Sequence, residues 1–198
     1  MTVKTIAYFE KVGSKNTDET LRFAHERALE LGIRDVVVAS SHGETALKAA
    51  KIFGSEKFNI VAVTICEGYR SEGWTMTVDE RKRLLDKGVK VFTGIHAFGG
   101  EVGSAFSEKR GGTTINEAVC ETLYRFCQGM KVAVEVALAA VELRKVKPQV
   151  KIIAVGGTGE GADTAIVVRT AVRNEAFGRD YEKRLSVQEI LAMPIEKL

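Results

Sequence analysis

Cysteine, proline and long apolar runs are all scarce in this sequence. Its 198 residues include 3 Cys and 2 Pro, and no CxxC or Cys/His ligand spacing occurs. Three cysteines cannot all pair with one another, so we expect free thiols in a reducing compartment and no metal site. No apolar run reaches the length of about 18 residues that a membrane span needs, and the N-terminus lacks a signal-peptide pattern. We therefore expect a cytoplasmic protein with no membrane partner.

A surplus of one charge is also missing. The 29 Lys and Arg residues and the 26 Asp and Glu residues give a formal net charge of +3, and the basic residues are spread along the chain. This distribution predicts no face for nucleic acid. The composition, 45% hydrophobic and 28% charged, is typical of a soluble globular protein, and the length predicts one domain over residues 1–198. Asn and Gln are few, a usage that fits a heat-adapted source.

Short β-branched apolar runs alternate with amphipathic stretches along the chain. The runs predict strands at Val3–Phe9, Asp35–Ala39, Asn59–Thr64, Val89–Thr93, Lys151–Val155 and Thr164–Arg169. The amphipathic stretches predict helices at Asp18–Leu31, Gly43–Phe53, Val78–Lys87 and Asn116–Lys145, the last with a break near Gly129. Strands that are apolar throughout, such as DVVVA, suit the middle of a parallel sheet covered by helices on both faces. The order is that of an α/β fold.

Five residue pairs have the spacing of a reciprocal helix cap, in which a hydroxyl or amide residue precedes a carboxylate by three positions. They are Asn16/Glu19, Ser41/Glu44, Thr77/Glu80, Thr114/Glu117 and Ser186/Glu189. Each pair predicts a helix N-terminus. One long irregular stretch remains, Gly94–Thr113, and a loop of that length inside a domain is typical of a lid or a binding loop.

The first candidate site follows the strand Asp35–Ala39. In open α/β sheets ligands bind beyond the carboxyl ends of the strands. The segment Ser40-Ser41-His42-Gly43-Glu44-Thr45 offers hydroxyls and free N–H groups at a helix start, which suit a phosphate. Ser41 and Glu44 alone would explain a plain helix cap, and Ser40, Gly43 and Thr45 then remain as the phosphate-binding residues.

The second candidate site is the glycine-rich segment Gly156–Asp163. Its four glycines allow successive N–H groups to converge on an anion. The candidate binding residues here are Gly157, Thr158, Gly159, Gly161 and Asp163. The segment fits neither GxGxxG nor a Walker A motif, and a strand follows it where a dinucleotide-binding fold has a helix. The alternative interpretation is a tight turn between two strands.

The long stretch Gly94–Thr113 supplies further candidates. Arg110 is a candidate phosphate clamp, and Gly111 and Gly112 follow it just before a helix start. His96 would titrate near neutrality or contact a ligand, although a lone histidine in a loop is often only solvated. We therefore interpret the stretch as a lid that covers an apolar or aromatic part of the ligand.

One carboxylate is a candidate for acid or base catalysis. Glu135 interrupts the apolar run Val132–Val141, and a desolvated carboxylate has a raised pKa. The alternative is a solvated stripe that Glu135 shares with Glu142, seven residues further along the same helix face.

Cysteines and the remaining histidines add little catalytic potential. Cys66 follows a strand end and is placed for ligand contact, whereas Cys120 and Cys127 have the spacing of core thiols. His25 lies inside an amphipathic helix and is expected to be structural. His42 has no carboxylate or cysteine partner nearby in sequence, so it predicts neither a triad nor a metal site.

One segment resembles a known domain. GETALKAAKIFGSEKFNIVAVT, residues 43–64, is similar to the C-terminal α/β domain of pyruvate kinase, where a Ser/Thr-Gly-x-Thr-Ala phosphate loop leads into a helix and a strand ending Ala-Val-Thr. Leu84–Val91 and Lys151–Val168 continue the similarity. The whole chain resembles still more closely small archaeal proteins that are freestanding versions of this domain. Tyr8-Phe9-Glu10-Lys11 and Met193-Pro194 match their terminal Tyr-Phe-x-Lys and Met-Pro strands.

The resemblance implies a three-layer α/β/α fold with a mostly parallel sheet and antiparallel strands near the C-terminus. The strands that precede the two candidate loops would be neighbours, so Ser40–Thr45 and Gly157–Asp163 would share one ligand, with Thr64 beside them. In pyruvate kinase the first loop holds the phosphate of a sugar bisphosphate. For the freestanding family, the expected ligand is flavin mononucleotide (FMN).

Three functional hypotheses follow from the residues and the resemblance. The first is a binding protein for a phosphorylated small molecule, with FMN as the expected cofactor. The second is a flavin-dependent oxidoreductase with His96, Cys66 or Glu135 as the proton-transfer group. The third is a regulatory or structural module that forms homo-oligomers. We expect no pyruvate kinase activity, because that chemistry belongs to a metal-binding barrel domain for which one α/β domain of 198 residues leaves no room.

Overall fold

The apolar β-branched runs of the sequence form one mixed sheet. The computed structural model describes residues 3–99 and 102–197, and over these residues the sheet has seven strands in the order β1-β7-β6-β5-β2-β3-β4. The strands are β1 Ala7–Phe9, β2 Asp35–Ala39, β3 Asn59–Thr64, β4 Lys90–Thr93, β5 Lys151–Gly156, β6 Thr164–Arg169 and β7 Ser186–Pro194. The predicted bounds of β2, β3 and β6 are confirmed, whereas β1 begins at Ala7 instead of Val3.

Strand direction changes once the chain reaches β6. β2, β3, β4 and β5 run parallel, while β6 pairs antiparallel with β5 and with β7. β7 in turn pairs parallel with the edge strand β1. The prediction of a helix start at Ser186 and Glu189 is wrong, because both residues lie in β7. Their backbones pair with β6, and this long-range pairing outweighs the local cap signal.

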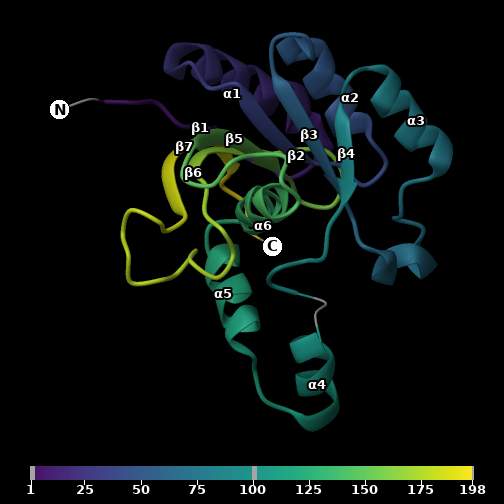
Figure 1. The fold of residues 1–198 in the computed structure, drawn as a ribbon, viewed down its shortest axis with the longest axis vertical. Coiled ribbons are helices and arrows are strands. Elements are labelled where there is room, and N and C mark those ends of the chain that lie inside the picture. Colours follow the sequence, from purple (N-terminus) through teal and green to yellow (C-terminus); the bar gives the residue numbers. More distant parts are fainter. Residues whose placement is uncertain (1–2, 100–101, 198) are drawn as a thin grey trace.

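Helices cover both faces of the sheet (Figure 1). They are α1 Thr17–Leu31, α2 Glu44–Ala49, α3 Val78–Asp86, α4 Val102–Arg110, α5 Ile115–Tyr124 and α6 Gln128–Glu142, with the short 3-10 or π-helical segments η1 Ser14–Asn16, η2 Ala50–Gly54 and η3 Glu67–Glu72. Side chains of α1, α2 and α3 join one apolar core, and those of α5 and α6 join the other. Val36 and Val38 of β2 face the first core and Val37 faces the second, as strand alternation requires. The fold is therefore the expected three-layer α/β/α arrangement. None of the helices in the described ranges is long and apolar enough to cross a membrane.

Two of the five predicted helix caps form. Thr77 and Thr114 each accept the N–H of the glutamate three residues on, and that glutamate accepts the N–H of the threonine. The prediction is wrong for Asn16, whose side-chain amide donates to the carbonyl of Lys11 over 2.7 Å. It is also wrong for Ser41, because α2 begins after Gly43 and the Ser41 side chain bonds no first-turn N–H.

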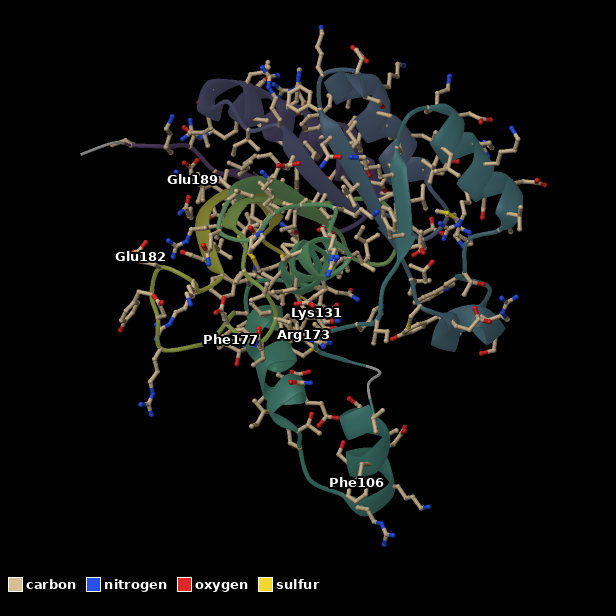
Figure 2. All side chains as sticks on the ribbon, viewed as in Figure 1. Phe106, Lys131, Arg173, Phe177, Glu182 and Glu189 are labelled. Atoms are coloured by element: carbon tan, nitrogen blue, oxygen red, sulfur yellow. The ribbon has the colours of Figure 1, made fainter. Side chains whose placement is uncertain are left out.

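The predicted irregular stretch Gly94–Thr113 contains a helix. α4 occupies Val102–Arg110, so the prediction of a continuous loop is wrong there; Gly100 and Glu101 lie outside the described residues. α4 projects away from the sheet, and its Phe106 is 68% exposed (Figures 1 and 2). No residue of α4 is buried, so the sheet contributes nothing to holding this helix in place.

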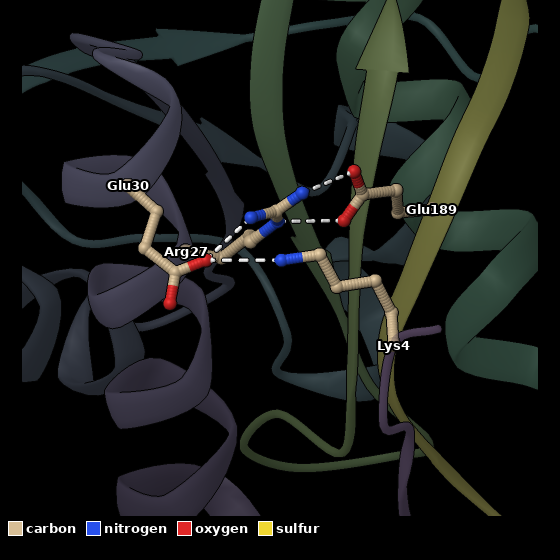
Figure 3. Close-up of polar contacts among 4 residues, drawn as sticks. All are labelled: Lys4, Arg27, Glu30 and Glu189. Atoms are coloured by element: carbon tan, nitrogen blue, oxygen red, sulfur yellow. Dashed lines mark hydrogen bonds and ion pairs between the residues drawn. The ribbon is translucent and has the colours of Figure 1, made fainter. Parts of the chain in front are cut away.

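A bidentate ion pair ties α1 to β7 (Figure 3). Nε and Nη2 of Arg27 donate to the two carboxylate oxygens of Glu189 over 2.7 and 2.6 Å. Glu30 accepts from Nη1 of Arg27 and, over 3.4 Å, from Nζ of Lys4. The Arg27 side chain is 14% exposed, so this fork-shaped contact is partly desolvated and positions the helix against the antiparallel end of the sheet.

Candidate functional site

The two candidate loops lie at the same edge of the sheet. β2 and β5 are neighbours, with Val36 opposite Ile153 and Val38 opposite Val155. The strands are parallel, so the segments after their carboxyl ends, Ser40–Thr45 and Gly157–Asp163, leave the sheet side by side. β2 then connects to α2 on one face, whereas β5 turns back into the antiparallel β6. Such a point of divergence is the usual ligand position in open α/β sheets.

A cavity of about 190 Å³ opens at this edge, on the α6 side of the sheet. Predicted site residues that line it are Ser40, Ser41, Thr64, His96, Glu135, Gly157 and Gly159. Residues that sequence reasoning did not single out also line it, among them Tyr69, Trp74, Tyr124, Gln128 and Lys131. The cavity thus joins the two loops to η3, to the segment after β4 and to α6.

The first loop is shaped by Ser40 and Gly43. Oγ of Ser40, a residue 7% exposed, accepts the N–H of Ala46 in the first turn of α2 over 3.3 Å. Gly43 has φ +95°, and a Cβ there would lie 3.0 Å from Leu84. Thr45 is buried inside the first turn of α2 and does not line the cavity. The serine that contacts the helix is therefore Ser40, and the Ser41 hydroxyl remains on the cavity wall.

Asp163 holds the second loop closed. Its Oδ2 accepts the N–H of Thr158 over 3.2 Å and the N–H of Gly13 over 3.0 Å, and Oδ1 accepts from the hydroxyl of Thr164 over 2.8 Å. The residue is fully buried. Both carboxylate oxygens are thus used inside the protein, which makes Asp163 an organiser of the loop.

Most glycines of the second loop are required by close packing. A Cβ on Gly156 would lie 2.3 Å from the carbonyl oxygen of Gly129 in α6, and one on Gly157 would lie 2.3 Å from that of Gly161. A Cβ on Gly161 would lie 2.5 Å from Cα of Ser14. Close packing within the loop and against α6 and Ser14 therefore accounts for these three glycines without a ligand.

Several polar groups of the second loop lack a partner. Within the described residues, the N–H groups of Gly159, Glu160 and Gly161 make no hydrogen bond. Gly159 has φ +68° and open space around its Cβ position. Oγ1 of Thr158 is buried without any hydrogen-bond partner, although the residue is only 8% exposed. Buried hydroxyls normally have a partner, so this one has bonding capacity for a water or a ligand, although Thr158 itself does not line the cavity.

A buried ion pair lies on α6. Nζ of Lys131 is 2.6 Å from Oε2 of Glu135, and their side chains are 7% and 8% exposed. Oε1 of Glu135 accepts the N–H of Phe98 over 2.8 Å. The alternative of a solvated stripe is wrong for Glu135, because the segment around Phe98 covers it, whereas Glu142 is exposed. Lys131 was missed, although a lysine four residues before a glutamate in an apolar helix is a detectable signal.

Aromatic side chains also line the cavity. The rings of Tyr69 and Trp74 are stacked, 5.7 Å apart at 3°, and the ring of His96 lies 5.4 Å from that of Tyr69. Burial raises the pKa of Tyr69 and of Tyr124. Burial also lowers the pKa of His96, an effect that Glu135 opposes and the charge of Lys131 strengthens. His96 is therefore a neutral ring at pH 7.

Other predicted site residues lie away from the cavity. Arg110, Gly111 and Gly112 are exposed at the end of the projecting α4 and do not line it (Figure 1). Cys66 is half-buried at the start of η3, outside the lining. Of the described residues of the predicted lid, the first three, Gly94–His96, line the cavity.

The remaining cysteines and histidines have structural environments. Cys120 and Cys127 are buried as expected, and Sγ of Cys127 accepts the N–H of Met130 at the start of α6. His25 contacts two phenylalanine rings. His42, which has no carboxylate partner nearby in sequence, has one in the fold, because its Nδ1 lies 3.2 Å from Oε1 of Glu80. No group of three or more metal-ligating side chains occurs in the ranges that the structure describes.

Comparison with known proteins identifies relatives of most of the chain. The family model of the pyruvate kinase alpha/beta domain matches residues 18–168. A crystal structure of a pyruvate kinase from Cryptosporidium parvum aligns with 78% of this chain at 16% identity and a TM-score of 0.42. The alignment covers 22% of that pyruvate kinase, so the chain spans about a fifth of its length.

Proposed function

This chain belongs to the pyruvate kinase alpha/beta domain family, and we propose that it is a binding protein for a phosphorylated small molecule. The observation that carries the proposal is the cavity at the carboxyl ends of β2 and β5, which both candidate loops line. A ligand in this position would contact both loops at once. We do not propose the activity of a whole pyruvate kinase for this chain, and we expect no phosphoryl transfer from phosphoenolpyruvate to ADP.

The phosphate end of the ligand is assigned to the two loops. Within the cavity lining, Gly159 offers an N–H group without a protein partner, and Ser41 offers a hydroxyl that no helix cap uses. Next to the lining, the second loop adds the unpartnered N–H groups of Glu160 and Gly161 and the buried hydroxyl of Thr158. Converging N–H and O–H donors are the usual recognition of a phosphate dianion where no cation is near.

We propose FMN as the ligand. The cavity offers a planar aromatic wall, Tyr69 and Trp74, against which a flat ring system would stack, and polar donors in the loops for the phosphate. At about 190 Å³ it is smaller than the roughly 300–1,000 Å³ of typical ligand pockets, so part of the molecule would extend beyond it. The residues present fit a phosphorylated ring compound in both chemistry and placement.

A flavin-dependent oxidoreductase is the second candidate, because two groups suited to proton transfer line the same cavity. Glu135 is a buried carboxylate and His96 is a half-buried ring whose pKa is lowered by burial. Bound flavin would supply hydride transfer, for which the protein provides orientation and exclusion of water. Cys66, the third catalytic candidate, lies outside the lining and has no part in this proposal.

Titration calorimetry with FMN and with riboflavin tests the proposal. The two ligands differ only in the phosphate, so FMN should bind at least about tenfold more tightly, the equivalent of one charge-assisted hydrogen bond. Ser41→Asp should weaken FMN binding by repelling the phosphate and leave riboflavin binding unchanged, with the neutral Ser41→Asn as the matched control. An absorption spectrum of protein purified without added cofactor reveals any flavin already bound. Equal affinity for both ligands, or indifference of FMN to Ser41→Asp, would overturn the phosphate site.

A further inference from the structure

The Lys131–Glu135 pair lines the cavity from a different side of α6 than the one that faces the glycine-rich loop. Cβ of Val132 is 3.1 Å from the position of a Gly156 Cβ, so Val132 faces that loop. Lys131 precedes it by one residue and therefore points about 100° away around the helix. Its Nζ is 3.8 Å from the position of a Gly99 Cβ, on the side of the segment after β4. A ligand held by its phosphate at the loops would extend toward this pair, whose side chains are buried (Lys131 is labelled in Figure 2).

The ammonium group of Lys131 has more hydrogen-bond donors than its partner in the protein uses. It carries three N–H groups, and within the described residues its only hydrogen-bonding or ionic partner is Oε2 of Glu135. The other carboxylate oxygen of Glu135 is occupied by the N–H of Phe98. Gly99 has no side chain that would cover the ammonium group. Two donors therefore remain for an acceptor that enters the cavity.

The charge of the site favours a neutral acceptor over an anion. Lys131 and Glu135 are the charged side chains of the cavity lining, and together they are neutral. A phosphate dianion beside Lys131 would meet the carboxylate of Glu135 as well, with little solvent to screen it. A carbonyl oxygen would accept from the ammonium group without this repulsion. His96 adds no compensating charge because it is neutral.

We propose that the Lys131–Glu135 pair binds a carbonyl group on a planar heterocycle, at the end of the ligand opposite its phosphate. The inference rests on the proposed phosphate site of the two loops, which sets the direction of the ligand. The stacked rings of Tyr69 and Trp74 line the same cavity and suit the ring that carries the carbonyl. The site selects phosphorylated heterocycles such as FMN and rejects sugar bisphosphates, whose second phosphate would lie beside Glu135.

The first test removes both charges together. Lys131→Met alone would leave Glu135 buried without a partner and destabilise the fold. Lys131→Met with Glu135→Gln leaves a neutral pair, and the new amide oxygen still accepts the N–H of Phe98. Riboflavin carries the ring carbonyls without the phosphate, so its affinity should fall at least about tenfold in the double variant. The affinity ratio of FMN to riboflavin should stay unchanged.

A matched control is available on α3. Lys82 and Asp86 form an exposed pair with the same four-residue spacing, 2.8 Å apart. The double variant Lys82→Met with Asp86→Asn should bind both flavins as the wild type does. Melting curves of the two double variants report whether either has lost its fold.

The second test reverses the selectivity. Glu135→Gln alone leaves Lys131 with an uncompensated positive charge in the cavity. We expect the wild type to bind fructose 1,6-bisphosphate at least about tenfold more weakly than FMN. The Glu135→Gln variant should bind this sugar bisphosphate at least about tenfold more tightly than the wild type does. Unchanged sugar bisphosphate affinity in this variant would overturn the inference.

The two proposals fail in different ways. Equal affinity of the wild type for FMN and riboflavin would overturn the phosphate site. Flavin binding by the wild type that is unaltered in the Lys131→Met, Glu135→Gln variant would overturn the carbonyl site alone. If neither flavin binds the wild type, the proposed ligand and the carbonyl site both fall.

Discussion

Replacing Gly129 by alanine should have two opposing effects on folding stability, a gain from helix propensity and a loss from overpacking. Gly129 lies in the first turn of α6, and alanine is favoured over glycine in a helix by at most about 1 kcal/mol. A Cβ on residue 129 would lie 2.2 Å from Oγ1 of Thr164 and 2.6 Å from Oδ1 of Asp163. Both neighbours are fully buried and bonded to each other, so neither has room to move away. Overpacking of this kind costs about 1–3 kcal/mol, so we expect a net destabilisation of roughly 1–2 kcal/mol.

Urea denaturation measures this change directly. The midpoint should shift to lower urea at an unchanged slope, because the native and unfolded states stay equally compact. For a chain of this size, about 1 kcal/mol corresponds to roughly 2–4 °C in Tm. Gln128→Ala, at the neighbouring position, adds no atom and should change stability by less than about 0.5 kcal/mol. A Gly129→Ala protein as stable as the wild type, or more stable, would refute the close approach of α6 to the start of β6.

Three further outcomes can be measured with the same denaturation assay. Ser40→Ala should lose about 1 kcal/mol of folding stability, because its hydroxyl accepts a first-turn N–H of α2, whereas Ser41→Ala should stay within about 0.5 kcal/mol of the wild type. Asp163→Ala should cost roughly 3 kcal/mol, because it removes the acceptor of a buried N–H, of a part-buried N–H and of the buried Thr164 hydroxyl; wild-type stability would contradict the role of the loop organiser. Arg27 lowers the pKa of Glu189, so this carboxylate stabilises the fold fully above the ordinary carboxyl pKa of about 4.3 and loses that effect as pH falls through the lowered value. The stability difference between wild type and Glu189→Gln should therefore be present at about pH 7 and shrink as the pH falls below about 4.3; a difference that does not change with pH would contradict the ion pair.

The sheet could be predicted from the sequence because its central strands are buried on both faces. Residues 35–39 and 59–64 are apolar nearly throughout, a pattern with little other explanation in an α/β chain. The edge strand β1 is short and half-exposed, and its predicted start was wrong. The predicted helix cap at Ser186 was wrong for a related reason. The conformation of this segment depends on pairing with β6, a long-range interaction that the local sequence does not reveal.

The candidate site was predictable only where it lies directly after a strand. Ser40, Thr64 and Gly157 line the cavity as expected, because parallel strands place their following residues at one edge. We did not predict Lys131 as a site residue, because the burial of its ion pair depends on the segment around Phe98. This segment folds over α6 from a distant part of the chain. Arg110 was placed at the site by its residue type, but an independent helix carries it away from the cavity.

The helix that carries Lys131 and Glu135 is buried on almost all sides, whereas no residue of α4 is buried. Amide protons in such a core helix exchange with solvent only through global unfolding, and those of an uncovered helix exchange through local opening. We therefore expect α6 to be among the slowest segments to take up deuterium and α4 among the fastest. The cavity wall formed by α6 would therefore exchange far more slowly than α4, which lies outside the cavity lining.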